Sequence, residues 1–235
     1  MKIKELIMGF FSKLFGKKEE KPKQEPVKPK EEEKIMGQKL TNQDIEAIAL
    51  EFGLDKAHVM AIFTVEAGGK SGFLKENPFI PVTLEEGHIF YKYAKQHGKD
   101  VADICKRYPT ICYPKWTKAY YKTGLAEYNR YLLAKEIDEE AANLATSWGM
   151  GQVMGFNYEA AGYSDLSSFI QAMYESEKCQ LLAVCRFIKS NTKMYKALKE
   201  EDWATFAKLY NGPGYAANKY DEKLKKAYEK YKKPV

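Results

Sequence analysis

Apolar residues recur every three to four positions along nearly the whole of residues 38–231, which is the period of amphipathic helices. The clearest case opens with Thr41 and Asp44, whose three-residue spacing is typical of a capped helix start. The apolar face that follows ends at Gly53, a common helix stop. A second helix is predicted from Asp55 to a pair of glycines at positions 68 and 69. A chain with this period folds mainly into helices around one core.

Later segments repeat the same period, and one short stretch departs from it. Helices are expected around residues 89–97, 125–137, 139–145, 169–188, 203–209 and 217–231. Residues 79–84 have the composition of a strand that Pro81 interrupts. We expect residues 107–124 to form a long loop rich in aromatic side chains. We therefore predict a mainly α fold with a small β-hairpin.

A change of composition separates residues 1–34 from a body at 35–235. Residues 16–34 alternate Lys and Glu around three prolines and hold one aliphatic side chain. Such a stretch buries too little apolar surface to offset the entropy of ordering. We predict a disordered linker there and a single folded domain after it.

Before the linker, apolar side chains fall on one helical stripe and lysines lie elsewhere on the wheel. No run there is long enough to span a bilayer, and no small-residue cleavage site follows. We interpret residues 1–18 as an amphipathic helix that docks on an anionic membrane surface, the alternative being a helix that packs on a partner or on the body. The stripe comprises Ile3, Leu6, Ile7, Phe10, Phe11, Leu14 and Phe15.

The charge distribution excludes one class of partner. Basic residues exceed acidic ones by 38 − 32 = +6, and residues 1–34, with ten Lys and seven Glu, hold +3 of that excess. The rest is spread over the body, whereas nucleic-acid binders concentrate it in a stripe. We therefore expect no nucleic-acid partner, and we expect the protein to be a monomer.

The four cysteines form no metal-binding pattern. Cys105, Cys112, Cys179 and Cys185 lack C-x-x-C spacing, and the chain has three histidines. We expect neither a metal nor another cofactor. Cys179 and Cys185 lie six apart in a predicted helix and so point to different faces. Whether any disulfide forms is left open, with buried free thiols as the alternative.

Glu66 is the most informative single residue. It lies seven, four and three positions after Val59, Ile62 and Phe63, so its carboxylate projects from the apolar stripe of its helix. Partial burial and the negative end of the helix dipole both raise the pKa of such a carboxyl. A carboxylic acid that stays protonated near neutral pH can serve as a general acid. The alternative is a Glu that reaches into solvent from a helix end.

Four motifs in order give the chain a family resemblance. They are VEAGGKSGFL at residues 65–74, EGHIFY at 86–91, SWGMGQVMGFNY at 147–158 and YNGPGY at 210–215. Together they resemble the N-acetylmuramidase family of phage endolysins and prophage-type peptidoglycan hydrolases over about residues 38–231. A more distant similarity connects them to lytic transglycosylases and goose-type lysozyme. The resemblance implies a lysozyme-like fold with Glu66 as catalytic acid.

A second carboxylate is expected from the EGH motif. Glu86 is the candidate that activates water or stabilises the positive sugar. The family usually has an apolar or aromatic residue before this motif, whereas this chain has Glu85, which leaves the choice between the two open. The alternative for Glu86 is a structural role that organises His88 or a nearby Arg such as Arg107. His88 is expected to be structural.

The remaining motif residues are expected to bind substrate. Gly149 lets backbone amides approach a sugar closely, and the Gln152 amide can bind an N-acetyl group. Trp148 is predicted to lie under a sugar face, with a core position as its alternative. Tyr210 is predicted to hydrogen-bond the Glu66 carboxyl, with helix-end packing as its alternative. Asn157 and Asn211 complete the predicted substrate-binding set.

These features predict a cell-wall glycosidase. The expected reaction is hydrolysis of the β-1,4 bond between N-acetylmuramic acid and N-acetylglucosamine in peptidoglycan, in the periplasm or outside the cell, by an export route left open. One alternative is a lytic transglycosylase, in which the muramic 6-hydroxyl replaces water. Another is a non-catalytic peptidoglycan-binding or membrane-active protein.

Overall fold

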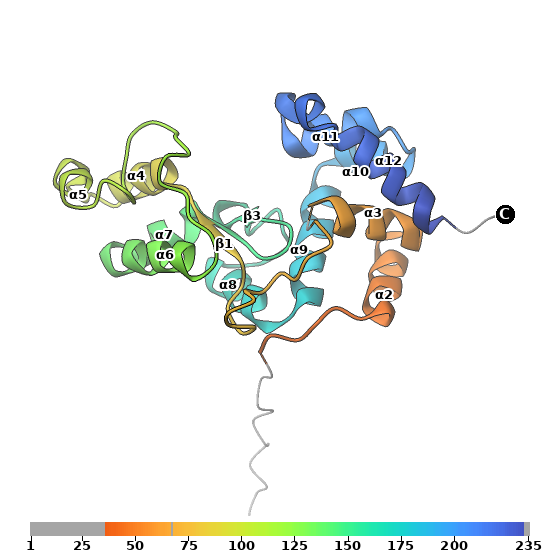
Figure 1. Ribbon diagram of the computed structural model, residues 1–235, viewed down its shortest axis with the longest axis horizontal. Helices are drawn as coiled ribbons and strands as arrows, with labels where there is room; N and C mark the ends of the chain where they lie inside the picture. Colours follow the sequence, from red (N-terminus) through yellow and green to blue (C-terminus); the bar gives the residue numbers. More distant parts are fainter. Residues whose placement is uncertain (1–35, 67, 233–235) are drawn as a thin grey trace, which may run out of the picture. The chain divides into compact units, whose positions relative to one another are not determined.

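The computed structural model describes residues 36–66 and 68–232. The predicted amphipathic helix at residues 1–18 and the linker at 16–34 lie outside the described residues. Within the described part the chain is mainly helical with one small sheet, as predicted (Figure 1). In chain order the elements are α2 (Asn42–Phe52), α3 (Lys56–Glu66), β1 (Thr83–Glu85), α4 (Gly87–Gln96), α5 (Val101–Arg107), α6 (Leu125–Ile137), α7 (Glu139–Ala145), β2 (Thr146–Trp148), β3 (Val153–Met154), η1 (Gly155–Asn157), α8 (Leu166–Glu175), α9 (Glu177–Ser190), α10 (Thr192–Lys199), α11 (Trp203–Asn211), η2 (Pro213–Asn218) and α12 (Tyr220–Tyr231).

Local signals placed the first helices correctly. The Thr41 hydroxyl accepts a hydrogen bond from the Asp44 N–H at 3.1 Å, and the Asp44 carboxylate accepts one from the Thr41 N–H at 3.0 Å. This reciprocal pair satisfies two N–H groups that the helix itself leaves open. Gly53 ends α2 with a φ of 58°, in the left-handed region that favours glycine.

The predicted helix over residues 169–188 is wrong, because the chain breaks at Ser176. Ser176 is extended, with φ −159° and ψ 156°, and its hydroxyl accepts a hydrogen bond from the Cys179 N–H. The residue thus ends α8 and caps α9. A β-bridge between Ser176 and Gln38 keeps the backbone extended between the two helices. The short helices α5 and α10 were not predicted.

The small sheet joins segments that are distant in sequence. β1 pairs antiparallel with β2, Thr83 facing Trp148, and β2 pairs antiparallel with β3, Ser147 facing Met154. The hairpin is therefore β2–β3. The third strand, β1, covers Thr83–Glu85, so it overlaps the predicted strand-like stretch at 79–84 only in the last two residues of that stretch. The turn between β2 and β3, residues 149–152, holds the Gly149 and Gln152 of the predicted site.

Two groups of helices flank this sheet. In Figure 1, α4 to α7 lie together on one side of it, and α2, α3 and α10 to α12 gather on the other. Helix α3 packs most extensively on α12, and α9 contacts both α2 and α10. The main core fills the space around Trp148, Phe90, Phe169 and Phe206, all without exposed surface.

Over residues 36–66 and 68–232 the structure has no helix that is both long and apolar enough to cross a membrane.

Candidate active site

The helix that carries Glu66 ends at that residue. Gly68 and Gly69 follow with φ of 58° and 62°, a left-handed backbone that turns the chain away from the helix axis. The side chain of Glu66 lies outside the described part of the structure. Its burial, its raised pKa and its role as an acid therefore stay predictions.

Glu177, a buried residue outside the four sequence motifs, anchors the chain that follows Glu66. Its carboxylate accepts hydrogen bonds from the Ser71 hydroxyl at 2.6 Å, the Gly72 N–H at 3.1 Å and the Leu40 N–H at 2.8 Å. Burial raises the pKa of Glu177, but the hydrogen bonds from Ser71 and Leu40 and the Lys39 charge outweigh burial and leave it lowered. An ionised carboxylate thus anchors the segment after α3 to α9.

Gln180, one turn further along α9, ties that segment to the β2–β3 turn. Its Oε1 accepts a hydrogen bond from the Met150 N–H at 2.9 Å, and its Nε2 donates to the carbonyls of Met173 and Gly72 at 2.8 and 3.4 Å. A Cβ at Gly72 would lie 1.7 Å from Gln180 Oε1, and one at Gly149 would lie 2.7 Å from its Cδ. Polar residues at i and i+3 among the apolar positions of α9 were the signal that could have revealed this role.

The turn itself is organised by Gln152. This residue adopts a φ of 49°, and its Oε1 accepts a hydrogen bond from the Ser147 hydroxyl at 2.9 Å. Its Nε2 donates to the carbonyls of Gly149 at 2.9 Å and Val82 at 3.3 Å. Both amide protons therefore have partners within the chain, and binding of a sugar by Gln152 stays a prediction.

Tyr210 lies over the same turn. Its hydroxyl donates to the Gly151 carbonyl at 3.4 Å, and its ring stacks on Phe206 at 5.8 Å. Asn211 ends α11 immediately after it, and Gly212 turns the chain with a φ of 77°. The structure thus brings the segment after Glu66, the Gly149–Gln152 turn and the Tyr210–Asn211 motif together.

Trp148 is a core residue, which corrects the prediction that it lies under a sugar. Its side chain has no exposed surface, its Nε1 donates to the Asn143 carbonyl at 3.2 Å, and Tyr131 packs edge-on against its ring at 4.9 Å. Its side chain points inward because this face of β2 packs on the core. Asn157 lies in η1, which packs on α7 and α8, and its sugar contact stays a prediction.

Glu86 stands between β1 and α4 as a partly exposed carboxylate. It retains 17% of its side-chain exposure, and its Oε2 accepts a hydrogen bond from the Tyr121 hydroxyl at 2.6 Å. Burial and the neighbouring Glu86 raise the pKa of Tyr121 well above its usual value, so the phenol remains a donor. His88 Nδ1 lies 3.4 Å from the same oxygen. Arg107 is engaged elsewhere, with Asp103.

Glu85 is buried in an internal ion-pair network. It has no exposed surface and contacts Arg130 Nη2 at 2.6 Å, while Glu127 contacts Arg130 Nη1 at 2.6 Å. Burial above all raises the pKa of Glu85 well above its usual value, and the Arg130 charge opposes this. The alternation of a strand sends Glu85 inward, and Glu86, at the strand end, stays accessible.

Replacing Arg130 tests this network. Arg130→Met is expected to lower the free energy of unfolding by about 3 kcal/mol, because it leaves two buried carboxylates without their cation. Urea unfolding measures the change. The control is Arg107→Met, which breaks an exposed arginine pair and should leave the urea midpoint unchanged. An Arg130→Met protein as stable as the parent would contradict a buried ionic network.

One hollow in the described part of the chain adjoins α3. It has a volume of about 510 Å³ and is lined by Thr64, Val65 and Gly68 on the α3 side and by Lys223, Lys226, Ala227 and Lys230 of α12. The three lysines are exposed, so they place positive charge beside the end of the helix that carries Glu66.

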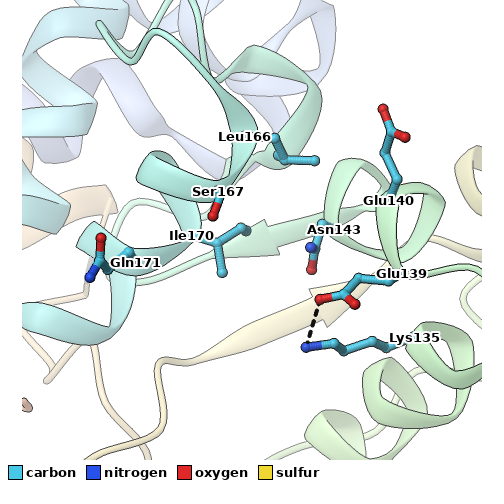
Figure 2. A pocket seen from close by; sticks show the side chains of 8 residues that line it. All are labelled: Lys135, Glu139, Glu140, Asn143, Leu166, Ser167, Ile170 and Gln171. Atoms are coloured by element: carbon cyan, nitrogen blue, oxygen red, sulfur yellow. Dashed lines mark ion pairs between the residues drawn. The ribbon is translucent and has the colours of Figure 1, made fainter.

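A larger hollow is separate from the predicted site residues. Figure 2 shows it between α6, α7 and α8, with the ion pair of Lys135 and Glu139 at 2.9 Å on its wall. Its volume is about 680 Å³, and it is lined by Lys135, Glu139, Glu140, Asn143, Leu166, Ser167, Ile170 and Gln171. None of the predicted catalytic or substrate-binding residues is in that lining.

Comparisons with known proteins agree with the family resemblance of the four motifs. The family model described as N-acetylmuramidase matches residues 55–232. Among solved structures, the crystal structure of the Burkholderia AP3 phage endolysin is similar, with a TM-score of 0.75 and 39% sequence identity over 83% of this chain and 72% of that chain. A comparison with curated proteins gave no match. The likeness confirms the predicted lysozyme-like endolysin fold, and the chain belongs to the N-acetylmuramidase family of peptidoglycan hydrolases.

Proposed function

We propose that the protein hydrolyses the β-1,4 bond between N-acetylmuramic acid and N-acetylglucosamine, with Glu66 as the general acid. The observation that carries this proposal is the assembly of three motif segments at one place. Gln180 connects Gly72 to the β2–β3 turn, and Tyr210 contacts the same turn through Gly151. Gly72 lies in the segment that follows α3, so these contacts bring the chain after Glu66 to the same turn.

Glu66 protonates the leaving glycosidic oxygen in this proposal. A general acid of this kind needs a carboxyl that is protonated at the working pH, and the end of a helix favours that form. The lysines of α12 beside α3 suit a polymer whose peptide stems carry carboxylates.

Glu86 is proposed as the second carboxylate, which activates water or stabilises the positive sugar. Its accessibility and its anchoring by Tyr121 support this choice, whereas the burial of Glu85 beside Arg130 argues against the neighbouring residue. His88, close to Glu86, is proposed to help orient that carboxylate rather than to transfer a proton.

Mass spectrometry of digested peptidoglycan tests the reaction. Hydrolysis yields reducing muramic acid ends, whereas a transglycosylase yields 1,6-anhydro ends that are lighter by one water. Intact glycan with retained binding would indicate a non-catalytic peptidoglycan-binding protein. Either of the latter results would overturn the proposed hydrolysis.

The leader is proposed to dock on an anionic membrane surface, and this makes a separate prediction. Deleting residues 1–34 should reduce co-sedimentation with anionic vesicles and killing of whole cells, because each lysine near such a surface contributes about 1 kcal/mol. Activity on soluble glycan should stay unchanged, since the motifs lie after residue 64. Equal sedimentation of full-length and truncated protein at low salt would contradict membrane docking. The apolar stripe would then be expected to pack on a protein partner or on the body of the chain.

A further inference from the structure

Two cysteines meet in the segment beside Glu86. Cys105 lies in α5 and Cys112 in the loop that follows, and their Sγ atoms are 3.2 Å apart. The N–H groups of Ile111 and Cys112 both donate to the Tyr108 carbonyl, which turns the chain back toward α5. A disulfide needs its sulfurs about 2 Å apart, so closing the bond takes a movement of about 1 Å.

We infer that Cys105 and Cys112 are a disulfide-forming pair that, once oxidised, braces residues 108–124 against the candidate active site. The segment touches the site in two places. The Gly87 N–H donates to the Tyr113 hydroxyl at 3.2 Å, one residue after Glu86, and the Tyr121 hydroxyl donates to Glu86 itself. A Cβ at Gly87 would lie 2.3 Å from the Tyr113 ring, so this packing leaves no gap.

The two thiols differ in solvent exposure, and this difference determines which of them reacts first. Cys105 is partly exposed and Cys112 is buried. Burial raises the pKa of Cys112, and its contact with Cys105 adds to this, so Cys112 is protected from solution reagents. A small disulfide from solution therefore reacts first at Cys105.

The reaction is a thiol–disulfide exchange in two steps. The Cys105 thiolate attacks one sulfur of a low-molecular-weight disulfide and releases one thiol. Cys112, losing its proton, then attacks the Cys105 sulfur of the mixed disulfide and releases the second thiol. Two electrons and two protons pass from the cysteine pair to the disulfide, which leaves as two thiols.

The location of the substrate supplies a reason for such a bond. Thiols stay reduced in the cytosol, whereas disulfides persist outside the cytoplasmic membrane, where peptidoglycan lies. A wall hydrolase would thus be made with free thiols and gain the cross-link where it works. This consequence rests on the proposed function, but the bond itself does not.

Peptide mapping of the full chain tests the pair. Reduced protein is incubated with glutathione disulfide, its remaining thiols are alkylated under denaturing conditions, and it is digested with trypsin. Cys105 falls in peptide 100–106 and Cys112 in peptide 108–115, whereas Cys179 and Cys185 share peptide 179–186. We expect peptides 100–106 and 108–115 to become linked to each other, while peptide 179–186 forms no link to another peptide and its buried Cys185 is alkylated. Full alkylation of Cys105 and Cys112, or glutathione that remains on Cys105, would overturn the inference.

Thermal unfolding tests the bracing role. Oxidised protein should unfold at a temperature higher by about 5 °C than reduced protein, because the bond restricts the unfolded chain. Cys105→Ser and Cys112→Ser should each abolish this difference, and Cys179→Ala should preserve it. Linked peptides without a rise in Tm would mean that the bond forms and braces nothing. Both readouts are independent of catalysis, so they distinguish failure here from failure of the proposed function.

Discussion

Glu66→Gln is expected to abolish cleavage of peptidoglycan while the protein keeps its fold. The amide matches the carboxyl in shape but has no acidic proton to give to the glycosidic oxygen. The loss should be on the order of a thousandfold in kcat, which combines lost general acid catalysis with lost positioning. Release of soluble muropeptides from purified sacculi measures it.

Glu51→Gln is the matched control for Glu66. It makes the same change of charge in the last turn of the neighbouring helix α2, on an exposed side chain. It should leave both activity and Tm as they are. If the Glu66→Gln protein unfolds at the parent's Tm and keeps more than about a tenth of its activity, another group is the acid.

Glu86→Gln has the second largest expected effect and separates two mechanisms. If Glu86 activates water or stabilises the positive sugar, its amide should lower kcat by a factor similar to that of Glu66→Gln. A transglycosylase that works through a single acid predicts a mild loss. The products of the same digests show which mechanism operates. A mild loss of kcat together with 1,6-anhydro ends would contradict the proposed hydrolysis and favour a transglycosylase.

Tyr121→Phe tests whether the anchoring of Glu86 matters. It removes the hydroxyl that donates to Glu86 Oε2 and keeps the ring, so kcat should fall about tenfold with little change in Tm. Tyr120→Phe, at the adjacent position, should leave kcat as it is. A parental kcat for Tyr121→Phe would show that this hydrogen bond does not position a working group.

Local signals in the sequence placed much of the helical framework. The predicted helices at 125–137 and 139–145 coincide with α6 and α7, and the Thr41–Asp44 pair caps α2 as predicted. Such features depend on groups within about one helical turn, so the order of residues carries them directly. The break at Ser176 was missed because the helical period continues on both sides of it. Its serine cap is a local signal, but the bridge that holds its backbone extended comes from Gln38, far away in the chain.

The sequence by itself therefore determined the helical class, the helix on which Glu66 stands and the motifs that indicate a muramidase. Tertiary structure alone decided which of these residues face inward: Trp148 enters the core, and Glu85 pairs with Arg130 while Glu86 stays accessible. The tertiary structure also places Glu177 and Gln180 where their side chains form hydrogen bonds with Gly72, in the chain after Glu66. The physical reason is that burial and hydrogen-bond partners come from segments as far apart as Leu40 and Glu177, 137 positions along the chain, and no local period encodes such a contact.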